Sequence, residues 1–378
     1  WLKIEDVSKR QLFCIDFACL FFAQLRVCMV VGHLASTTSP TIGTFNDAWD
    51  IQRMIAKGMF GEIYEVTHKM SGRVEAVKRL GTTNKDFLRA AQQEAKIWRY
   101  IGQHRNIVRL RAVFESPDAI FLVMEKCECH VLARLADGYR MNQLMPVFQQ
   151  MLCGIQCLHA ANVVHRDVKL ENFLCCGKTL ECIKLCDFGF AIEVPLGKDL
   201  DGVFGTPPYM SPEMLAKSHN TKTDIWSMGV CCFFLLSGGR FPYEPKDPSD
   251  HSSATMKNAI LDGSQIKDFD APKNVTSEAK RFAITLLNRT SASRPRAEEC
   301  LRIPFLCSTH CRHVSPTCSE KSTVASEQEA ALATMHGTDD LGDESFNFRT
   351  PAKNMTDKRK ISIGLASKGK LAPTIFEL

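Results

Sequence analysis

Three side chains of different chemistry lie close together in the segment 165–172, which reads His-Arg-Asp-Val-Lys-Leu-Glu-Asn. Asp167 supplies a carboxylate, Lys169 an ammonium group and Asn172 a carboxamide. This set suits phosphoryl transfer, because that chemistry depends mostly on positioning and on neutralising charge. A carboxylate would hold the attacking hydroxyl group, a cation would offset the moving charge, and a neutral oxygen would help to bind a metal ion. A polar loop after an apolar strand is the simpler alternative for this segment alone.

A second acidic group follows a short apolar strand. Residues 183–186 predict the strand, and Asp187-Phe188-Gly189 come directly after it. An acidic side chain at a strand end, beside a glycine, suits the coordination of Mg²⁺. The triplet by itself would be common by chance.

Two glycines mark a turn earlier in the chain. Residues 51–66 alternate as a strand, a turn and a strand, with Gly58 and Gly61 at the turn. Glycines there let backbone amides close over phosphate groups without a side chain in the way. A simple glycine hairpin is the alternative.

A buried ion pair is predicted between the next strand and the helix after it. In the strand 74–78, a period of two places Val74, Ala76 and Lys78 on one face. Helical spacing over residues 86–101 places Glu94 on an apolar stripe with Ala91, Ala95, Trp98 and Ile101. Because a charge on an apolar face needs a partner, we expect Glu94 to pair with Lys78 rather than to reach water at the edge of the stripe.

Together these motifs resemble the protein kinase family. The catalytic loop, the Asp-Phe-Gly triplet, the glycine-rich loop and the strand lysine occur in the family's order between residues 49 and 306. Lys169 is typical of the serine/threonine kinases, and the sequence is closest in character to calcium/calmodulin-dependent and calcium-dependent kinases. The resemblance implies an α+β fold of two lobes. A small β-rich N-lobe with one key helix would span residues 49–125, and a larger helical C-lobe would span residues 128–306.

The resemblance also implies roles for individual residues. The expected catalytic residues are Asp167, Lys169, Asn172, Lys78 and Glu94. Asp167 would act as the base on the substrate hydroxyl group, and Lys169 would offset the phosphoryl charge. Asn172 and Asp187 would hold Mg²⁺, and Lys78 would reach the α- and β-phosphates of ATP. The expected lining of the ATP site is Ile55, Ala56, Lys57, Gly58, Gly61, Ile63, Ala76, Lys78, Met124, Glu125, Cys127, Leu174 and Asp187. Cys186 would be a thiol beside the nucleotide, either partly accessible or buried and inert.

Two departures from the family pattern leave an alternative open. Ala56 stands where the first loop glycine is usual, and Cys129-His130-Val131 replaces the usual glycine pair after the hinge. Both favour a nucleotide-binding pseudokinase that acts as a scaffold, whereas the complete catalytic set favours an enzyme. Cys127, Cys129 and His130 could bind a metal ion, but no second cluster completes such a site.

The segment that resembles an activation loop has an unusual composition. Residues 190–205 contain no Ser, Thr or Tyr, so no phosphate can be attached there to pair with Arg166. We expect the fixed carboxylates Asp199 and Asp201 to take that role, and the loop to need no phosphorylation.

Three further contacts are implied by the resemblance. Thr206 is expected to contact the catalytic aspartate, and Asp224 to brace the catalytic loop. Arg294 is expected to pair with Glu213. Glu171 would favour protein substrates with basic residues upstream of the target hydroxyl group.

Composition limits the other possibilities. The chain has 378 residues, of which 45% are hydrophobic and 24% charged, as in ordinary globular proteins. A net charge of +5 without a Lys/Arg-rich run gives no support for nucleic-acid binding. Its 17 cysteines are scattered through apolar segments. This favours reduced thiols in a reducing compartment, the cytoplasm, over a disulfide framework.

Both ends of the chain differ from the centre. In residues 1–48, an apolar stretch at 12–34 contains Asp16 and Arg26, and a Ser/Thr/Pro-rich linker follows. A membrane span or targeting segment, as in a membrane-tethered receptor, is therefore only an alternative. The composition of residues 307–378 favours disorder. The basic run 358–360 could bind calmodulin or another regulator, a solvated tail being the alternative. A zinc site among the Cys and His residues of 307–318 is also left open.

Overall fold

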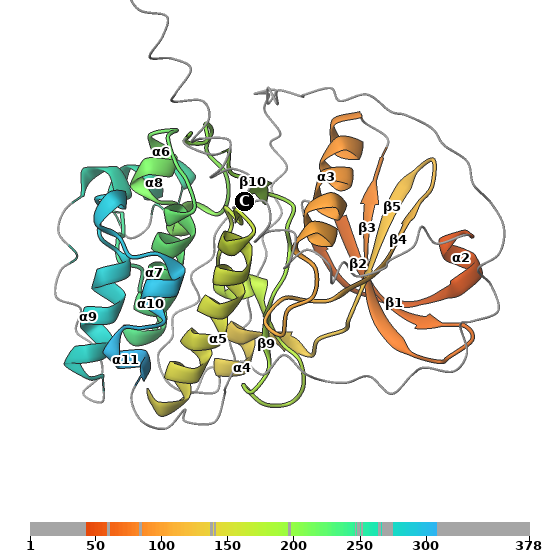
Figure 1. The fold of residues 1–378 in the computed structure, drawn as a ribbon, viewed down its shortest axis with the longest axis horizontal. Helices are drawn as coiled ribbons and strands as arrows, with labels where there is room; N and C mark the ends of the chain where they lie inside the picture. The colour runs from red at the N-terminus through yellow and green to blue at the C-terminus, as the bar shows by residue number, and fades with distance from the viewer. Residues whose placement is uncertain are drawn as a thin grey trace, which may run out of the picture.

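Two lobes make up the described part of the chain (Figure 1). The computed structural model describes residues 43–58, 61–82, 85–136, 139, 141–195, 198–245, 247, 250, 252–263, 266 and 275–307. One lobe is a β-sheet with a long helix, the other is mostly helical, and residues 125–128 connect them. The predicted α+β bilobal fold is confirmed. The apolar stretch 12–34 and the basic run 358–360 lie outside the described residues.

The N-lobe is built on a five-stranded antiparallel sheet with the order β1-β2-β3-β5-β4. Its strands are β1 (Trp49–Gly58), β2 (Gly61–His68), β3 (Val74–Gly81), β4 (Leu110–Glu115) and β5 (Ala119–Met124). In β3, Ala76 and Lys78 are both buried, but Glu75 and Val77 on the opposite face are buried too. Val74, at the start of the strand, is exposed.

Helix α3 (Lys85–Ile101) packs against this sheet and carries the predicted buried stripe. Ala91, Glu94, Ala95 and Trp98 are buried along it. The indole Nε1 of Trp98 donates a hydrogen bond to the backbone oxygen of Val108 at 2.7 Å. This bond ties the last turns of α3 to the segment that precedes β4.

The opposite face of the sheet is covered by the short helix α2 (Phe45–Ala48). Phe45 stacks on Phe121, with 4.3 Å between ring centroids, and meets Phe114 edge-on. These contacts belong to a second small apolar cluster that consists of Phe45, Trp49, Val66, Val77, Phe114 and Val123. Residues 45–48 therefore pack as part of the N-lobe, although they precede the region that resembles kinases.

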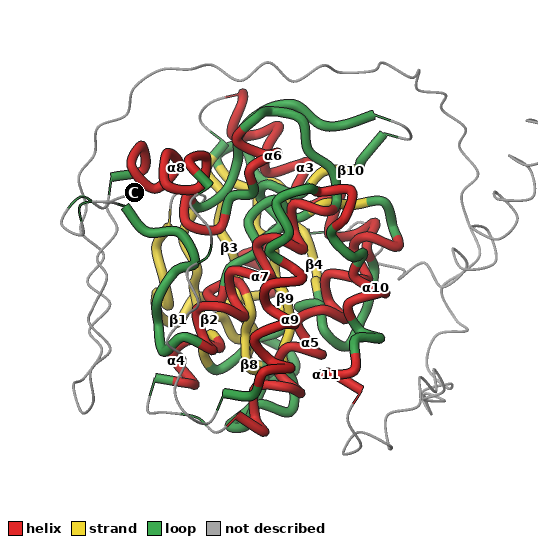
Figure 2. Tube along the Cα trace, turned by 90° about the vertical axis from the view of Figure 1, so that its left-hand side faces the viewer, coloured by secondary structure: helices red, strands yellow, loops and turns green. Residues whose placement is uncertain are grey.

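The C-lobe is a set of helices around a buried central helix (Figures 1 and 2). The helices are α4 (Val131–Leu135), α5 (Met141–Ala160), α6 (Pro212–Leu215), α7 (Lys222–Leu236), α8 (Ser253–Asp262), α9 (Ser277–Leu286), α10 (Ala297–Cys300) and α11 (Pro304–Cys307). Helix α7 is apolar around nearly its whole circumference and is buried between α5 and α9. It therefore offers a rigid base for the loops that it contacts.

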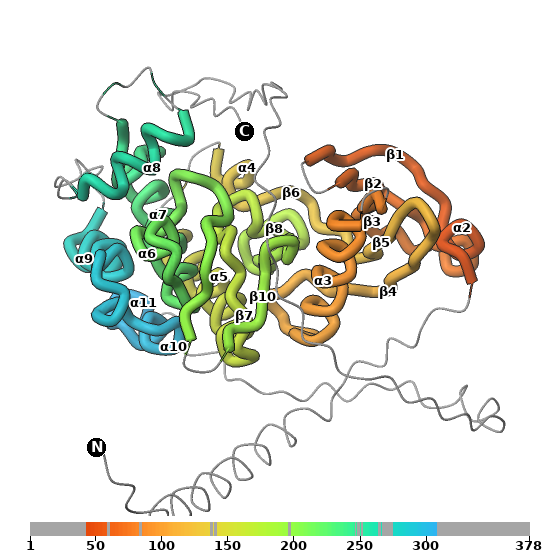
Figure 3. Tube along the Cα trace, turned by 90° about the horizontal axis from the view of Figure 1, so that it is seen from above, coloured from red at the N-terminus to blue at the C-terminus, as the bar shows by residue number. Residues whose placement is uncertain are grey.

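Short strands and turns lie where the lobes meet (Figure 3). One small sheet has the order β6-β8-β9, and β10 pairs with β7 in another. The strands are β6 (Cys129–His130), β7 (Val163–Val164), β8 (Phe173–Cys175), β9 (Ile183–Leu185) and β10 (Ile192–Glu193). Three 3-10 turns complete the fold: η1 (Leu170–Asn172), η2 (Pro207–Tyr209) and η3 (Ser291–Ser293). The segments that carry the predicted chemistry connect these elements.

The cysteines depart from expectation at one place. Cys127 and Cys176 form a disulfide, although they are 49 residues apart. The prediction of reduced thiols is therefore wrong for this pair, because the hinge and the end of β8 meet only in the folded chain. The described cysteines that are free are Cys129, Cys153, Cys157, Cys175, Cys182, Cys186, Cys231, Cys232, Cys300 and Cys307. Among the residues that the structure describes, no helix is both long enough and apolar enough to cross a membrane.

Candidate active site

A buried ammonium group joins two carboxylates from different lobes. Lys78 Nζ on β3 lies 2.8 Å from Glu94 Oε1 on α3 and 2.7 Å from Asp187 Oδ1, just after β9. Lys78 is 6% exposed and Glu94 2%. The predicted Lys78–Glu94 pair is confirmed, and the structure adds Asp187 to it. One network of ion pairs therefore connects the N-lobe with the C-lobe.

Lys78, Glu94 and Asp187 shift one another's pKa values. Burial lowers the pKa of Lys78, but Asp187 and Glu94 outweigh it, so the pKa lies above its usual value. Burial likewise opposes ionisation of Asp187, but Lys78 outweighs it and lowers the pKa. For Glu94, burial prevails and raises the pKa. With both carboxylates ionised, the network keeps a net negative charge, which favours a further cation at this site.

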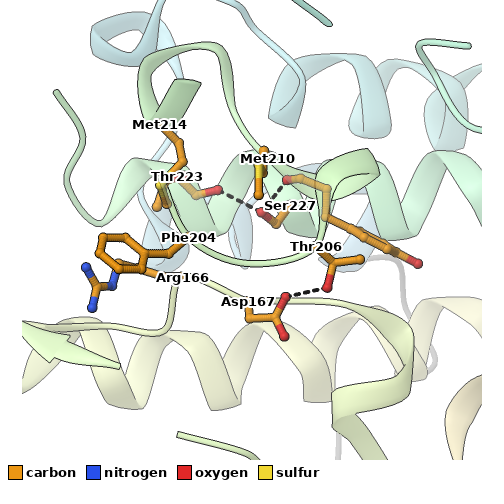
Figure 4. A pocket seen from close by; sticks show the side chains of 9 residues that line it. Arg166, Asp167, Phe204, Thr206, Met210, Met214, Thr223 and Ser227 are labelled. Atoms are coloured by element: carbon orange, nitrogen blue, oxygen red, sulfur yellow. Dashed lines mark hydrogen bonds between the residues drawn. The ribbon is translucent and has the colours of Figure 1, made fainter. Parts of the chain in front are cut away.

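The carboxylate of Asp167 is held on both of its oxygens. Thr206 Oγ1 donates a hydrogen bond to Oδ1 at 2.7 Å, as Figure 4 shows, and Lys169 Nζ lies 2.9 Å from Oδ2. Lys169 Nζ also donates to Thr206 Oγ1 at 2.9 Å. The predicted contact of Thr206 with Asp167 is confirmed. The carboxylate and the ammonium group are thus fixed side by side.

Asn172 uses its side-chain nitrogen to hold this loop. Its Nδ2 donates to the backbone oxygen of Asp167 at 2.8 Å. The carboxamide oxygen is then the atom that a metal ion could take, on the buried turn η1. A carboxamide oxygen and the Asp187 carboxylate are ligands that Mg²⁺ accepts, so the residues fit this ion. The described residues contain no group of three or more His, Cys, Asp or Glu side chains that could hold a metal ion.

Asp224 on α7 anchors the catalytic loop from below, as predicted. Its Oδ2 accepts the backbone N–H of His165 at 2.9 Å, and its Oδ1 accepts that of Arg166 at 2.9 Å. His159 Nε2 lies 2.8 Å from Oδ2. Arg166 has φ of +67°, in the left-handed region that is costly for residues other than glycine. The hydrogen bonds that Asp224 accepts from His165 and Arg166 stabilise this strained turn.

Three aromatic side chains form a column beside the ion-pair network. The ring of Phe188 lies 5.1 Å from that of Trp98 on α3 and 5.6 Å from that of His165. Phe188 is fully buried. This column places the segment after β9 directly between α3 and the catalytic loop. It therefore holds Asp187, the neighbour of Phe188, toward Lys78.

Arg166 does not pair with the predicted carboxylates. Its guanidinium carbon lies 3.9 Å from the centroid of the Phe204 ring, and its Nε donates to the backbone oxygen of Phe190 at 2.6 Å. Burial lowers the pKa of Arg166 to about 10. The prediction that Asp199 or Asp201 pairs with Arg166 is wrong. A neutral aromatic face takes that place, because it avoids burying a second charge.

Asp199 instead fastens the activation segment to the loop before α7. It accepts hydrogen bonds from Ser218 Oγ at 2.8 Å and from Asn220 Nδ2 at 3.0 Å. Two backbone hydrogen bonds between Leu200 and His219 run beside them. The expectation that a fixed carboxylate holds this segment is therefore confirmed for Asp199, although with different partners.

Gly205 and Glu213 secure the rest of this segment. At Gly205, with φ of +93°, a Cβ atom would lie 2.3 Å from the backbone oxygen of Arg166, so only glycine fits. Glu213 pairs with the buried guanidinium of Arg294, as predicted, with 3.1 Å between Oε2 and Nη2. Ser227 Oγ donates to the backbone oxygen of Tyr209 at 2.7 Å (Figure 4). The segment is thus packed onto both the catalytic loop and α7.

Several residues of the predicted ATP lining are paired with one another in the N-lobe sheet. Ala56 pairs with Ile63 and Lys57 with Glu62 across the β1–β2 turn, where Gly58 faces Gly61. Ala76 pairs with Met124, the last residue of β5. Ile55, Ala56 and Lys57 are exposed, as are the other residues of the edge strand β1 after Trp49.

The side chains of the hinge residues Glu125 and Cys127 make contacts within the protein. The Glu125 carboxylate turns away to Lys184 Nζ at 2.7 Å and to the backbone N–H of Arg109 at 2.6 Å. The Cys127 side chain is in the disulfide, so it is not a metal ligand with Cys129 and His130. Leu174 on β8 is half-buried and pairs with His130. Cys186 is half-buried, and burial raises the pKa of its thiol, which favours the inert alternative.

Sequence reasoning missed three residues of this site. Phe204 covers Arg166, Trp98 supports Phe188, and Cys176 bonds the hinge. Only Trp98 had a signal, since it lies on the predicted stripe one helical turn after Glu94. The other two depend on contacts between loops, which leave no periodic pattern in the sequence.

Comparisons with known proteins agree with this geometry. The sequence model of the protein kinase domain family matches residues 49–306. The serine/threonine-protein kinase PEPKR2 of Arabidopsis thaliana is 32% identical over 281 residues, which are 72% of this chain and 56% of that protein. The calcium/calmodulin-dependent protein kinase type II of Caenorhabditis briggsae is 33% identical over 275 residues, 70% of this chain and 49% of that protein.

The chain therefore belongs to the protein kinase family, and its catalytic domain is of the serine/threonine type. Myosin light chain kinase 2 of Oryctolagus cuniculus is another relative, 32% identical over 254 residues, which cover 66% of this chain and 41% of that protein. The chain spans about half the length of these curated relatives. The likeness to calcium/calmodulin-dependent and related kinases, expected from the sequence, is confirmed.

We predict that Asp224→Asn destabilises the chain by about 2–3 kcal/mol at pH 7, because an amide cannot accept N–H groups on both sides. Burial opposes ionisation of Asp224, but hydrogen bonds from His159 and the loop outweigh it, so the folded pKa is lowered. The stabilisation is therefore full above the unfolded pKa of about 3.9 and is lost as pH falls through the folded value. Urea unfolding should show the difference from wild type shrinking below about pH 4. Asp50→Asn, on the surface, is the control. A difference that is constant with pH would contradict this account.

Proposed function

We propose that this chain transfers the γ-phosphate of ATP to serine or threonine hydroxyl groups of protein substrates, with Mg²⁺. The observation that carries the proposal is the network of Lys78, Glu94 and Asp187 beside the fixed Asp167–Lys169 pair. A phosphoryl group needs charge neutralisation on one side and a positioned hydroxyl group on the other. The two clusters offer these functions from the same border between the lobes.

Asp167 is suited to orient the acceptor hydroxyl group and to take its proton. Its carboxylate cannot rotate freely, because Thr206 and Lys169 each hold one oxygen. Lys169 stands beside it, so that its ammonium group can offset the charge on the moving phosphoryl group. A carboxylate held in place needs little reorganisation during the reaction.

ATP and Mg²⁺ would use groups from both lobes. Asp187 and Asn172 would hold the ion, which when bound neutralises phosphate charge. Lys78 would bind the α- and β-phosphates, with Glu94 keeping it in place. The backbone N–H of Cys127 has no hydrogen-bond partner within the described part of the chain, so it can bind the adenine edge. Ala56 adds one methyl group to the loop and leaves the β1–β2 turn intact.

Glu171 supports a preference for basic protein substrates. It lies on η1, next to Asn172, and its Oε2 is buried without a hydrogen-bond partner among the described residues. Because the residue as a whole is half-buried, a guanidinium group of a substrate would bind its other carboxylate oxygen, Oε1. We propose calmodulin as a regulator from the name of one relative and from the basic run 358–360, and added calcium and calmodulin would test it.

We predict that the purified chain phosphorylates a serine peptide with upstream arginines, using Mg²⁺-ATP. Asp187→Asn should lower the rate at least about a hundredfold, because it removes a charge that binds the metal. Glu171→Gln should raise the KM for the arginine peptide about tenfold, since a charge-assisted hydrogen bond is lost. It should leave the KM for a neutral peptide unchanged.

Measurement of radiolabelled phosphate on the peptide, beside calorimetric ATP binding, separates the two functions that the sequence left open. ATP binding without transfer by the wild type would contradict the kinase proposal and support the scaffold. Glu193→Gln, an exposed carboxylate on β10 outside the segment 165–172, is the matched control.

We also predict that Phe204 positions the catalytic loop through Arg166. Phe204→Leu should lower kcat about tenfold, because the loss of a desolvated cation–π contact costs about 1–2 kcal/mol. Phe204→Tyr keeps an aromatic face and should retain most of the activity. KM for ATP should change little in either variant, since Phe204 contacts Arg166 and Phe190 rather than a residue of the expected ATP lining. Equal loss in both variants would contradict this role.

A further inference from the structure

A disulfide lies beside the hinge on which the nucleotide site depends. Cys127 belongs to the segment that connects the lobes, and Cys176 directly follows β8. Their Cα atoms are 4.4 Å apart, within the range that a disulfide spans. Both residues are half-buried, so solutes can reach them.

Backbone hydrogen bonds hold the two residues together independently of the disulfide. The N–H of Glu128 donates to the oxygen of Cys175 at 2.9 Å, and Cys129 pairs with Cys175 in the β6–β8 ladder. The N–H of Cys176 donates to the oxygen of Cys182 at 2.9 Å. The two thiols would therefore stay close in the reduced chain. The disulfide can form or break without a change of strand pairing.

Three buried cysteines of the C-lobe, Cys175, Cys231 and Cys232, are poorer candidates for oxidation. Cys175 is buried, and burial raises the pKa of its thiol to about 11. Burial also raises the pKa of Cys231 and of Cys232 on α7 well above the usual value. Oxidants react with thiolates. These three thiols are buried from solvent, and their raised pKa values keep them protonated, so both features protect them from oxidation.

We propose that Cys127 and Cys176 are a reversible oxidation site that controls the stiffness of the hinge. Hydrogen peroxide oxidises one thiolate to a sulfenic acid and is itself reduced to water. The second thiol then attacks that sulfur, so that the S–S bond forms, the S–O bond breaks and the oxygen leaves as water. A dithiol reductant reverses the bond by exchange and becomes a disulfide itself.

We expect the disulfide to affect nucleotide binding, and this part of the inference rests on the proposed function. The backbone of Cys127 faces the expected adenine position, and Leu174, two residues before Cys176, forms the expected floor of the same pocket. The disulfide joins these two walls covalently. The oxidised chain is therefore better organised for ATP than the reduced one, because less order has to be gained on binding.

The test compares the whole chain in wild-type form with Cys176→Ser and with the control Cys182→Ser. Each is treated with hydrogen peroxide or with dithiothreitol, alkylated, digested and analysed by mass spectrometry. We expect a linked Cys127–Cys176 peptide in peroxide-treated wild type and in the control, and none in Cys176→Ser. We expect oxidation to raise the melting temperature of those two proteins by about 5 °C or more. Cys176→Ser should melt like reduced wild type under both conditions.

Calorimetry with Mg²⁺-ADP completes the test. Oxidation should increase the affinity of wild type and of Cys182→Ser about twofold to fivefold and leave that of Cys176→Ser unchanged. Free, alkylated Cys176 after peroxide treatment would overturn the proposal, as would equal melting temperatures and affinities in the oxidised and reduced wild type. Absence of phosphate transfer in both redox states would contradict the proposed enzymatic function only, since the linked peptide and the melting shift do not depend on it.

Discussion

Everything at the candidate site depends on keeping a buried lysine paired with two carboxylates. Burying charges costs several kcal/mol for each ion, and close pairing has to offset that cost. Lys78 reaches Glu94 only when α3 packs on the sheet, and it reaches Asp187 only when the segment after β9 turns toward it. The network therefore depends both on the position of α3 and on how the two lobes are placed relative to each other. Loss of either contact would leave an uncompensated charge in the interior.

The C-lobe provides the other half of the site by bracing a strained loop on a buried helix. Asp224 binds two backbone N–H groups of that loop, and the aromatic face of Phe204 covers Arg166. The column of Trp98, Phe188 and His165 then connects this half to the ion-pair network. Every one of these contacts is made by the chain itself, without a phosphate on the activation segment. The geometry thus explains how a segment without Ser, Thr or Tyr can be ordered.

The sequence predicted those parts that follow a period or a motif. The Lys78–Glu94 pair could be predicted, because a strand period and a helix period placed both charges on buried faces. The contact of Arg166 was predicted incorrectly, since composition showed only that a phosphate was excluded and not that a ring would replace it. The partner of Cys127 could not be predicted either. Both depend on which loops meet in space, and loops carry no periodic signal that could show it.

The most direct test of this account is the rate of phosphate transfer by a chain that carries no phosphate. The chain would be produced in bacteria and treated with phosphatase, and its mass would be checked before its rate on the arginine peptide is measured. The account predicts a rate within about twofold of that of the untreated chain, because Phe204 and Asp199 already hold the activation segment. A fall of about tenfold or more, recovered only after rephosphorylation, would contradict it.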